Sequence, residues 1–185
     1  MIYKLVLNFK NPLVKNDIKN IHGLHMIVCS MFEKGVLWRL KDNVLYVKSC
    51  VPRFISCSYV LSMVALQEYW NTEADFELTA RPTKVIRDDD RKHGRRVPVD
   101  PLPWLERKAT TSGFEVVCAD IESRQTVRGF KLGHKMIFNR VDFKGKLRIL
   151  DRTLFEQALN AGIGPSKGYG FGLLMTGGAG GVASW

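Results

Sequence analysis

The first 80 residues carry a succession of apolar patterns that strongly limits the folds open to this chain. Apolar and polar residues alternate over 3–9, as in a half-buried strand, and a helical spacing follows. Two short apolar runs separated by Lys41-Asp42-Asn43 indicate a hairpin. The elements expected are strands at 3–9, 36–40, 44–48 and 76–80 and helices at 17–32 and 59–69. This order, strand-helix-strand-strand-helix-strand, is that of a ferredoxin-like module.

The second half of the chain repeats this order less regularly after an inserted arm. The segment 84–99 is rich in lysine and arginine, and its apolar ends predict the two strands of a hairpin. The elements expected beyond it are a helix from 104 to 113, strands at 114–119, 126–132, 136–143 and 146–150, a helix at 151–162 and a last strand at 171–175. Asp151 and Gly162 are typical residues for the start and end of that second helix.

Charge and composition restrict the partners. Lysine and arginine outnumber aspartate and glutamate by 28 to 18, a formal net charge of +10 at pH 7. This excess favours a polyanion, either a nucleic acid or an anionic membrane surface. No apolar run approaches the ~20 residues of a membrane span, so we expect a cytoplasmic protein without a membrane partner. The four cysteines lack a C-x-x-C spacing and only two of the four histidines lie close together, which predicts neither a metal site nor a cofactor.

The glycine-rich segment 162–172 surrounds Lys167 and runs into the last apolar strand. Glycine reaches left-handed backbone angles at little cost, and without a Cβ its backbone N–H can approach an anion closely. The segment therefore predicts a phosphate-binding loop, with Gly164, Ser166 and Lys167 as contacts and Tyr169 as the aromatic residue placed to meet a base. A glycine-rich turn with no ligand is the alternative.

Four further stretches, together with the glycine-rich segment, keep a common order along the chain: residues 36–40, 78–84, 104–107 and 142–147. In this order they resemble the CRISPR repeat-processing endoribonucleases, in particular the CasE subtype that serves the type I-E Cascade complex. The resemblance implies an α+β fold of two tandem ferredoxin-like (RRM-like) domains, residues 1–83 and 84–185, with a basic hairpin arm at 84–99.

The same resemblance implies a function. The family's enzymes cleave CRISPR precursor RNA at the base of the repeat stem-loop without a metal, leaving 5′-OH and 2′,3′-cyclic phosphate ends. Product retention would make the protein a Cascade subunit bound to its mature guide RNA. The expected partners are therefore the repeat RNA stem-loop and other Cascade subunits, especially the backbone subunit. A repeat-RNA-binding subunit that cleaves weakly or not at all is the alternative.

The family's catalytic histidine lies on the first helix, a few residues before a closing phenylalanine. Counting back from Phe32 selects His25, whereas counting forward from Asp17 selects His22. The family often has tyrosine three residues before the histidine, where this chain has His22, and that spacing places both imidazoles on one helix face. We expect His25 to be the principal general acid/base and His22 to orient the 2′-OH or share the proton transfer. Lys34 is a candidate cation beside them.

The arm is predicted to bind RNA. A narrow basic hairpin can enter or straddle the deep major groove of an A-form stem, which ordinary side chains cannot read. The residues assigned to this role are Arg87, Arg91, Lys92, Arg95 and Arg96. A solvated charged face is the alternative, because the central aspartates 88–90 would repel RNA.

Overall fold

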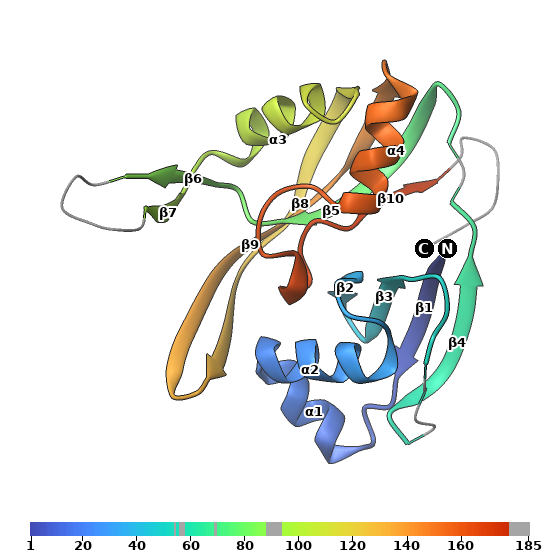
Figure 1. Ribbon diagram of the computed structural model, residues 1–185, viewed down its shortest axis with the longest axis vertical. Helices are drawn as coiled ribbons and strands as arrows, with labels where there is room; N and C mark the ends of the chain where they lie inside the picture. The colour runs from blue at the N-terminus through green and yellow to red at the C-terminus, as the bar shows by residue number, and fades with distance from the viewer. Residues whose placement is uncertain (54, 56–57, 69, 88–93, 178–185) are drawn as a thin grey trace.

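The computed structural model describes residues 1–53, 55, 58–68, 70–87 and 94–177. The protein is α+β, as predicted, with two four-stranded antiparallel sheets and a two-stranded arm (Figure 1). The helices are α1 (Pro12–Lys19), α2 (Ile21–Met31), α3 (Pro101–Thr110), α4 (Arg152–Ala161) and the short 3₁₀ helix η1 (Lys167–Tyr169). The strands are β1 (Ile2–Leu7), β2 (Leu37–Lys41), β3 (Val44–Lys48), β4 (Val60–Leu66), β5 (Glu73–Ala80), β6 (Thr83–Ile86), β7 (Arg95–Pro98), β8 (Phe114–Lys131), β9 (His134–Ile149) and β10 (Leu174–Gly177).

Both large sheets have the ferredoxin-like strand order. The first sheet runs β2-β3-β1-β4 and the second runs β10-β5-β9-β8, so in each the first and third strands of the unit are central. In the second unit α3 and α4 connect strands as the pattern requires, and the β6–β7 arm is inserted between β5 and α3. No helix of the described residues is both long and apolar enough to cross a membrane.

The helix predicted at 59–69 is wrong. Residues Val60–Leu66 form β4, which pairs antiparallel with β1 through Lys4 and Val64. Because β3 covers only one edge of β1, the backbone groups on the other edge need a partner, and this long-range pairing overrides the helix propensity of leucine, methionine and alanine. The strand predicted at 76–80 is present as β5. It pairs with β9 and β10, so it lies in the second sheet although the predicted boundary at residue 83 assigned it to the first domain.

The single helix predicted at 17–32 is two helices. Asn20 has an extended backbone (φ −118°, ψ 103°) that ends α1, and its side-chain oxygen accepts a hydrogen bond from the N–H of His22 at the start of α2. Asparagine is among the strongest N-cap residues, so a local preference explains the break.

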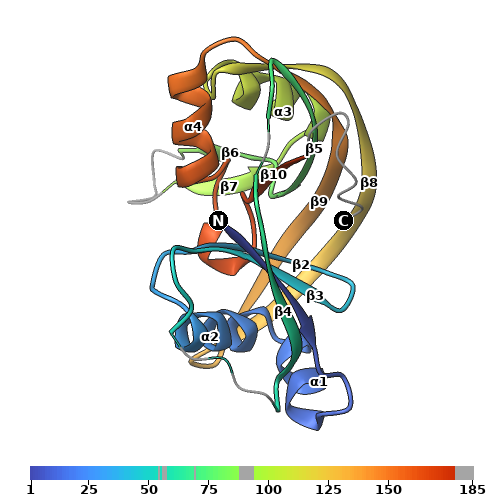
Figure 2. The ribbon, with the colours of Figure 1, turned by 90° about the vertical axis from the view of Figure 1, so that its right-hand side faces the viewer.

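Four short strands predicted between 114 and 150 merge into one long hairpin, β8–β9. Two register shifts, at Val116/Cys118 and Ile121/Ser123, let the hairpin curve without interruption. Gly145 is required within β9, because a Cβ there would lie 2.0 Å from the Cys118 carbonyl oxygen. The hairpin sweeps from the second sheet down to α2, as Figures 1 and 2 show.

The two larger of three hydrophobic clusters lie against the two sheets, and residues late in the chain complete the first one. Phe138 of β9 and Phe171 of the glycine-rich loop belong to the core built by β1, β2, β3 and α2. The second core includes Trp104 and Phe155. The long hairpin and the glycine-rich loop therefore bring the two halves of the chain together beside α2.

Candidate active site

Helix α2 presents His22 and His25 on one face, at its N-terminal end. Their ring centroids lie 5.9 Å apart, and both rings are half-buried. The Asn20 side-chain oxygen that caps α2 also accepts a hydrogen bond from the backbone N–H of Phe130, at the tip of the β8–β9 hairpin. One asparagine thus fixes the start of the helix and the end of the hairpin relative to each other.

The glycine-rich loop faces these histidines. The Tyr169 ring lies 5.3 Å from the His25 ring and 6.3 Å from the His22 ring, centroid to centroid. The Gly168 carbonyl accepts a hydrogen bond of 3.1 Å from the indole N–H of Trp38, a buried residue of β2. This bond holds the η1 turn against the first sheet and so fixes the position of Tyr169 beside the imidazoles.

The environment of His25 favours its neutral form. Burial lowers the pKa of the His25 imidazole from its ordinary value of 6.5; a hydrogen bond with the backbone of Gly168 opposes this shift, and the positive charges of His22 and Lys131 add to it. The Cys29 sulfur lies 3.7 Å from Nδ1 of His25, one helical turn away. Lys131, the last residue of β8, follows Phe130, whose N–H is bonded to the Asn20 cap of α2, and its charge contributes to the lowered pKa of His25.

Arg81, which follows β5, connects the loop to the β8–β9 hairpin. Its guanidinium donates to the Ser166 hydroxyl at 3.1 Å and lies over the Phe138 ring, 4.8 Å from the centroid. Phe138 in turn packs against Tyr169, with ring centroids 5.2 Å apart. Burial lowers the pKa of Arg81, and the charge of Arg96 lowers it further. Sequence reasoning assigned no role to Arg81, Phe138 or Lys131, because no local motif links them to the histidines.

The loop glycines make close contacts inside the protein. A Cβ on Gly164 would lie 2.8 Å from the Trp104 ring, and one on Gly170 would lie 2.7 Å from the Trp38 ring. Both have positive φ, as does the non-glycine residue Ser166, at 66°. These contacts give the glycines a packing function that is independent of any ligand. They also shape the turn so that Gly168 and Tyr169 face α2.

The predicted RNA-binding arm is a β-hairpin of β6 and β7, paired from Thr83↔Pro98 to Ile86↔Arg95. It projects from the second half of the molecule (Figure 1). Arg87, Arg95 and Arg96 are exposed on it. Arg91 and Lys92 lie outside the described residues.

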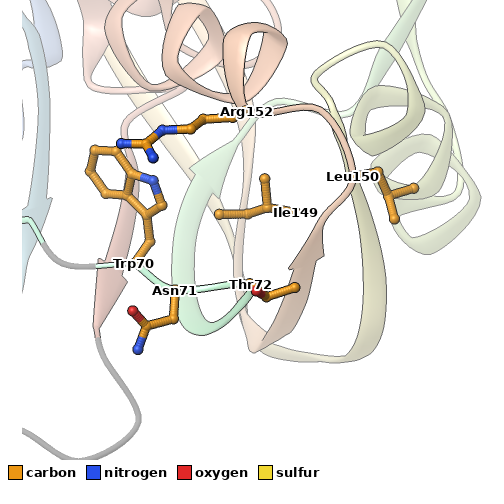
Figure 3. A pocket seen from close by; sticks show the side chains of 6 residues that line it. All are labelled: Trp70, Asn71, Thr72, Ile149, Leu150 and Arg152. Carbon is orange, nitrogen blue, oxygen red and sulfur yellow. The ribbon is translucent and has the colours of Figure 1, made fainter.

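Two other cavities lack both histidines. A cavity of about 550 Å³ is lined by Trp70, Asn71, Thr72 and Arg152, with the Arg152 side chain reaching over the Trp70 ring (Figure 3). It holds no histidine. Lys34, the sequence-based candidate cation, is exposed and lines a different cavity with Met1 and Asn160, one that does not include His25. Within the described part of the chain, no group of three or more histidine, cysteine, aspartate or glutamate side chains is placed to hold a metal ion.

Comparisons with known proteins define the class to which this arrangement belongs. A family model described as CRISPR associated protein matches residues 2–176, so the chain belongs to that family. It is 23% identical to the CRISPR-associated endoribonuclease Cse3 of Thermus thermophilus over 92% of this chain and 96% of that protein.

Solved structures agree in fold. Thermus thermophilus Cse3 bound to an RNA representing a pre-cleavage complex matches with a TM-score of 0.80 at 23% identity, covering 96% of this chain and 98% of that chain. Cas6e from Escherichia coli K-12 matches with a TM-score of 0.71 at 22% identity, covering 95% and 98%. The two-sheet architecture is therefore the one found in Cse3 and Cas6e.

Proposed function

We propose that this protein is an endoribonuclease that cleaves CRISPR precursor RNA at the base of the repeat stem-loop and then stays bound to the mature guide RNA as a Cascade subunit. Family membership and near full-length similarity to Cse3 support the activity. The observation that carries the site is the contact between His25 on α2 and residues 168–169 of the glycine-rich loop. A proton-transferring group and a loop suited to phosphate thereby share one location.

The reaction needs no metal ion if one side chain removes a proton and another donates one. The 2′-OH attacks the adjacent phosphorus, the bond from phosphorus to the 5′-oxygen breaks, and the products carry a 2′,3′-cyclic phosphate and a 5′-OH. A base takes the proton of the 2′-OH and an acid gives one to the departing 5′-oxygen. The lowered pKa of His25 keeps its imidazole neutral near pH 7, which suits the base. His22, on the same helix face, orients the 2′-OH or shares the proton transfer.

Charge also builds on the phosphate during this step, and a cation beside His25 would stabilise it. Lys131 of the β8–β9 hairpin fits this requirement better than Lys34, because it follows Phe130, whose N–H is bonded to the Asn20 cap of α2, whereas Lys34 lines a cavity that does not include His25. Ser166 and Lys167 of the loop, and Arg87, Arg95 and Arg96 of the arm, contact the RNA backbone in this proposal. Arg81 holds Ser166 in place.

Single-turnover cleavage of a repeat hairpin tests the assignment. Replacing His25 by alanine should lower the rate by about 10²- to 10⁴-fold, the usual contribution of a general acid or base. Affinity for the hairpin should stay near that of the unchanged protein, which shows that the variant is folded. A His25→Ala protein that cleaves at the original rate would remove His25 from the mechanism.

The same assay separates the enzyme from a repeat-RNA-binding subunit with little or no activity, the alternative raised by His22 in the family's tyrosine position. Cleavage in the presence of EDTA is expected for the metal-independent mechanism. Cleavage only on addition of magnesium would contradict it. Tight hairpin binding without cleavage under either condition would favour the binding subunit.

A further inference from the structure

A second candidate site lies where the arm, α3 and the glycine-rich loop meet. It is a cavity of about 350 Å³ whose walls include Thr83 of β6, Arg96 of β7, Trp104 and Lys108 of α3, and Lys167 of the loop. Neither His25 nor Tyr169 lines it, so it is separate from the catalytic arrangement.

The cavity concentrates positive charge. Arg96, Lys108 and Lys167 come from three different elements, and none of the described residues lining the cavity is acidic. Within the described part of the chain, none of these three side chains forms an ion pair. Like charges held around one partly enclosed space repel one another, and an anion bound among them would relieve that repulsion.

Thr83, in the wall of the cavity, has a side-chain hydroxyl without a hydrogen-bond partner among the described residues. This residue is only 9% exposed, and its hydroxyl is buried. Buried polar groups in folded proteins are nearly always hydrogen-bonded, so this residue of the cavity wall holds an unused donor that a rotation of its side chain would offer to an acceptor oxygen in the cavity.

The C-terminal end of α3 also borders the cavity, and unpaired carbonyls there would oppose an anion. Two of these carbonyls are already satisfied. The Lys108 carbonyl accepts a hydrogen bond of 3.0 Å from the Thr111 hydroxyl, and the Ala109 carbonyl accepts one of 2.9 Å from the N–H of Ser112.

We propose that this cavity is a phosphate subsite for the RNA strand. In it, Arg96, Lys108 and Lys167 contact one phosphodiester group and the Thr83 hydroxyl donates a hydrogen bond to the same group. The inference rests on the proposed function: Lys167 and Tyr169 belong to one 3₁₀ turn, so a strand cleaved beside His25 continues past Lys167. A free phosphate-bearing ligand offers the same chemistry, and the experiment distinguishes the two.

The first measurement uses inorganic phosphate and no RNA. Phosphate is titrated into the full chain, with chloride at equal ionic strength as the reference, and the Trp104 indole N–H resonance is followed. We expect a saturable shift in the unchanged protein that is lost in Lys108→Gln. Arg107→Gln is the matched control, because Arg107 is the exposed neighbour of Lys108 on α3 and does not line the cavity.

Thr83→Val tests the orphaned hydroxyl without a large change in shape. It should weaken phosphate binding while leaving the melting temperature unchanged or higher, because the buried hydroxyl has no partner to lose in the free protein. A Thr83→Val protein that binds phosphate as well as the unchanged protein would remove this residue from the site.

The second measurement uses the His25→Ala protein and a repeat hairpin with 2′-deoxyribose at the cleavage position, which lacks the attacking 2′-OH, so it reads binding whether or not His25 is the base. Loss of one phosphate contact should reduce the slope of log affinity against log salt by about 0.7–0.9 in Lys108→Gln, relative to Arg107→Gln. Unchanged slopes together with no phosphate shift would overturn the subsite. Saturable phosphate binding with unchanged slopes would overturn the RNA strand as its occupant and leave a free phosphate-bearing ligand.

Discussion

The rings of His25 and Tyr169 lie 5.3 Å apart, although they come from a helix near the N-terminus and a turn near the C-terminus. Tyr169 is held from behind by Phe138, whose ring is 5.2 Å away, so the phenol ring is wedged between the β8–β9 hairpin and the imidazole. This packing restricts the orientations open to His25. Burial is the main cause of the lowered pKa of the imidazole, and the Tyr169 ring contributes to that burial.

Tyr169 should therefore act as a positioning residue. We expect Tyr169→Ala to lower the single-turnover rate by about 10- to 100-fold, because a small misplacement of a catalytic group is costly. Tyr169→Phe should retain a rate close to that of the unchanged protein, since the ring contact is kept. The alanine variant should also shift the acid limb of the pH–rate profile towards pH 6.5, a change that simple loss of stability would not produce. Equal loss in both variants would assign the effect to the hydroxyl group.

The pH dependence of cleavage follows from the lowered pKa of His25. As a general base it must be neutral, so the rate should fall as the pH drops through its pKa, and that limb should lie below pH 6.5. Between pH 6.5 and the lower pKa of His25 in the folded state, the folded chain also binds fewer protons than the unfolded chain. The contribution of His25 to the free energy of unfolding is therefore fully present above pH 6.5. It is lost as the pH falls through the pKa of His25 in the folded state. An acid limb at or above pH 6.5 would contradict the assignment of His25 as the base.

Local signals account for the parts of the fold that were predicted correctly. Asp151 and Gly162 bound α4 as predicted: the Asp151 side chain accepts a hydrogen bond from the Leu154 N–H, and Gly162 has a φ of 75°. The turn at Asp42 joins β2 and β3, and the ends of the arm pair as a hairpin. Each of these elements depends on residues within a few positions of one another, so a local sequence pattern is enough to predict it.

The elements that the sequence pattern predicted wrongly depend on long-range contacts. β4 forms where a helix was predicted because β1 offers it an edge. The candidate site was also predictable only in its local part. The spacing of His22 and His25 along the helix was enough to infer that they share one face. Their contact with Tyr169, and the approach of Lys131, depend on a hairpin and a loop whose paths no local motif specifies.

The glycine-rich loop gives a stability prediction with an internal control. Gly170 has a φ of +79°, and an added Cβ would lie 2.7 Å from the Trp38 ring, whereas a Cβ on Gly168 would lie an ordinary 3.6 Å from His25. We expect Gly170→Ala to reduce the free energy of unfolding by about 1–2 kcal/mol or more, the cost of a left-handed alanine plus the clash. Gly168→Ala should cost much less in the same denaturant titration. Comparable losses would show that the Trp38 contact does not constrain the loop.

The arm should contribute to affinity through charge. Arg87 is exposed at the end of β6, and its replacement by alanine should reduce the slope of log affinity against log salt by about 0.7–0.9 if it neutralises one phosphate. Lys10 is another exposed cation, in the turn after β1, and serves as the control. Binding of the repeat hairpin at several salt concentrations measures both. A slope unchanged in Arg87→Ala, or lowered equally in Lys10→Ala, would identify the arm as a solvated face.

A buried ion pair joins the two sheets and supports the site. Arg39 of β2, only 1% exposed, donates to the Glu77 carboxylate of β5 at 2.6 Å, and Arg39 directly follows Trp38, which binds the Gly168 carbonyl. Glu77→Gln should destabilise the protein by about 3–5 kcal/mol, because it leaves the Arg39 charge buried without its counterion.

The double variant Arg39→Met, Glu77→Leu is the control, because it removes both charges and keeps apolar volume. It should lose less stability than Glu77→Gln alone, since neither partner is left uncompensated. Denaturant unfolding measures the free energies, and cleavage by the folded fraction shows whether β2 still supports the η1 turn. If Glu77→Gln were as stable as the unchanged protein, the buried Arg39 charge would not depend on that carboxylate, and the ion pair would not help to hold the two sheets together.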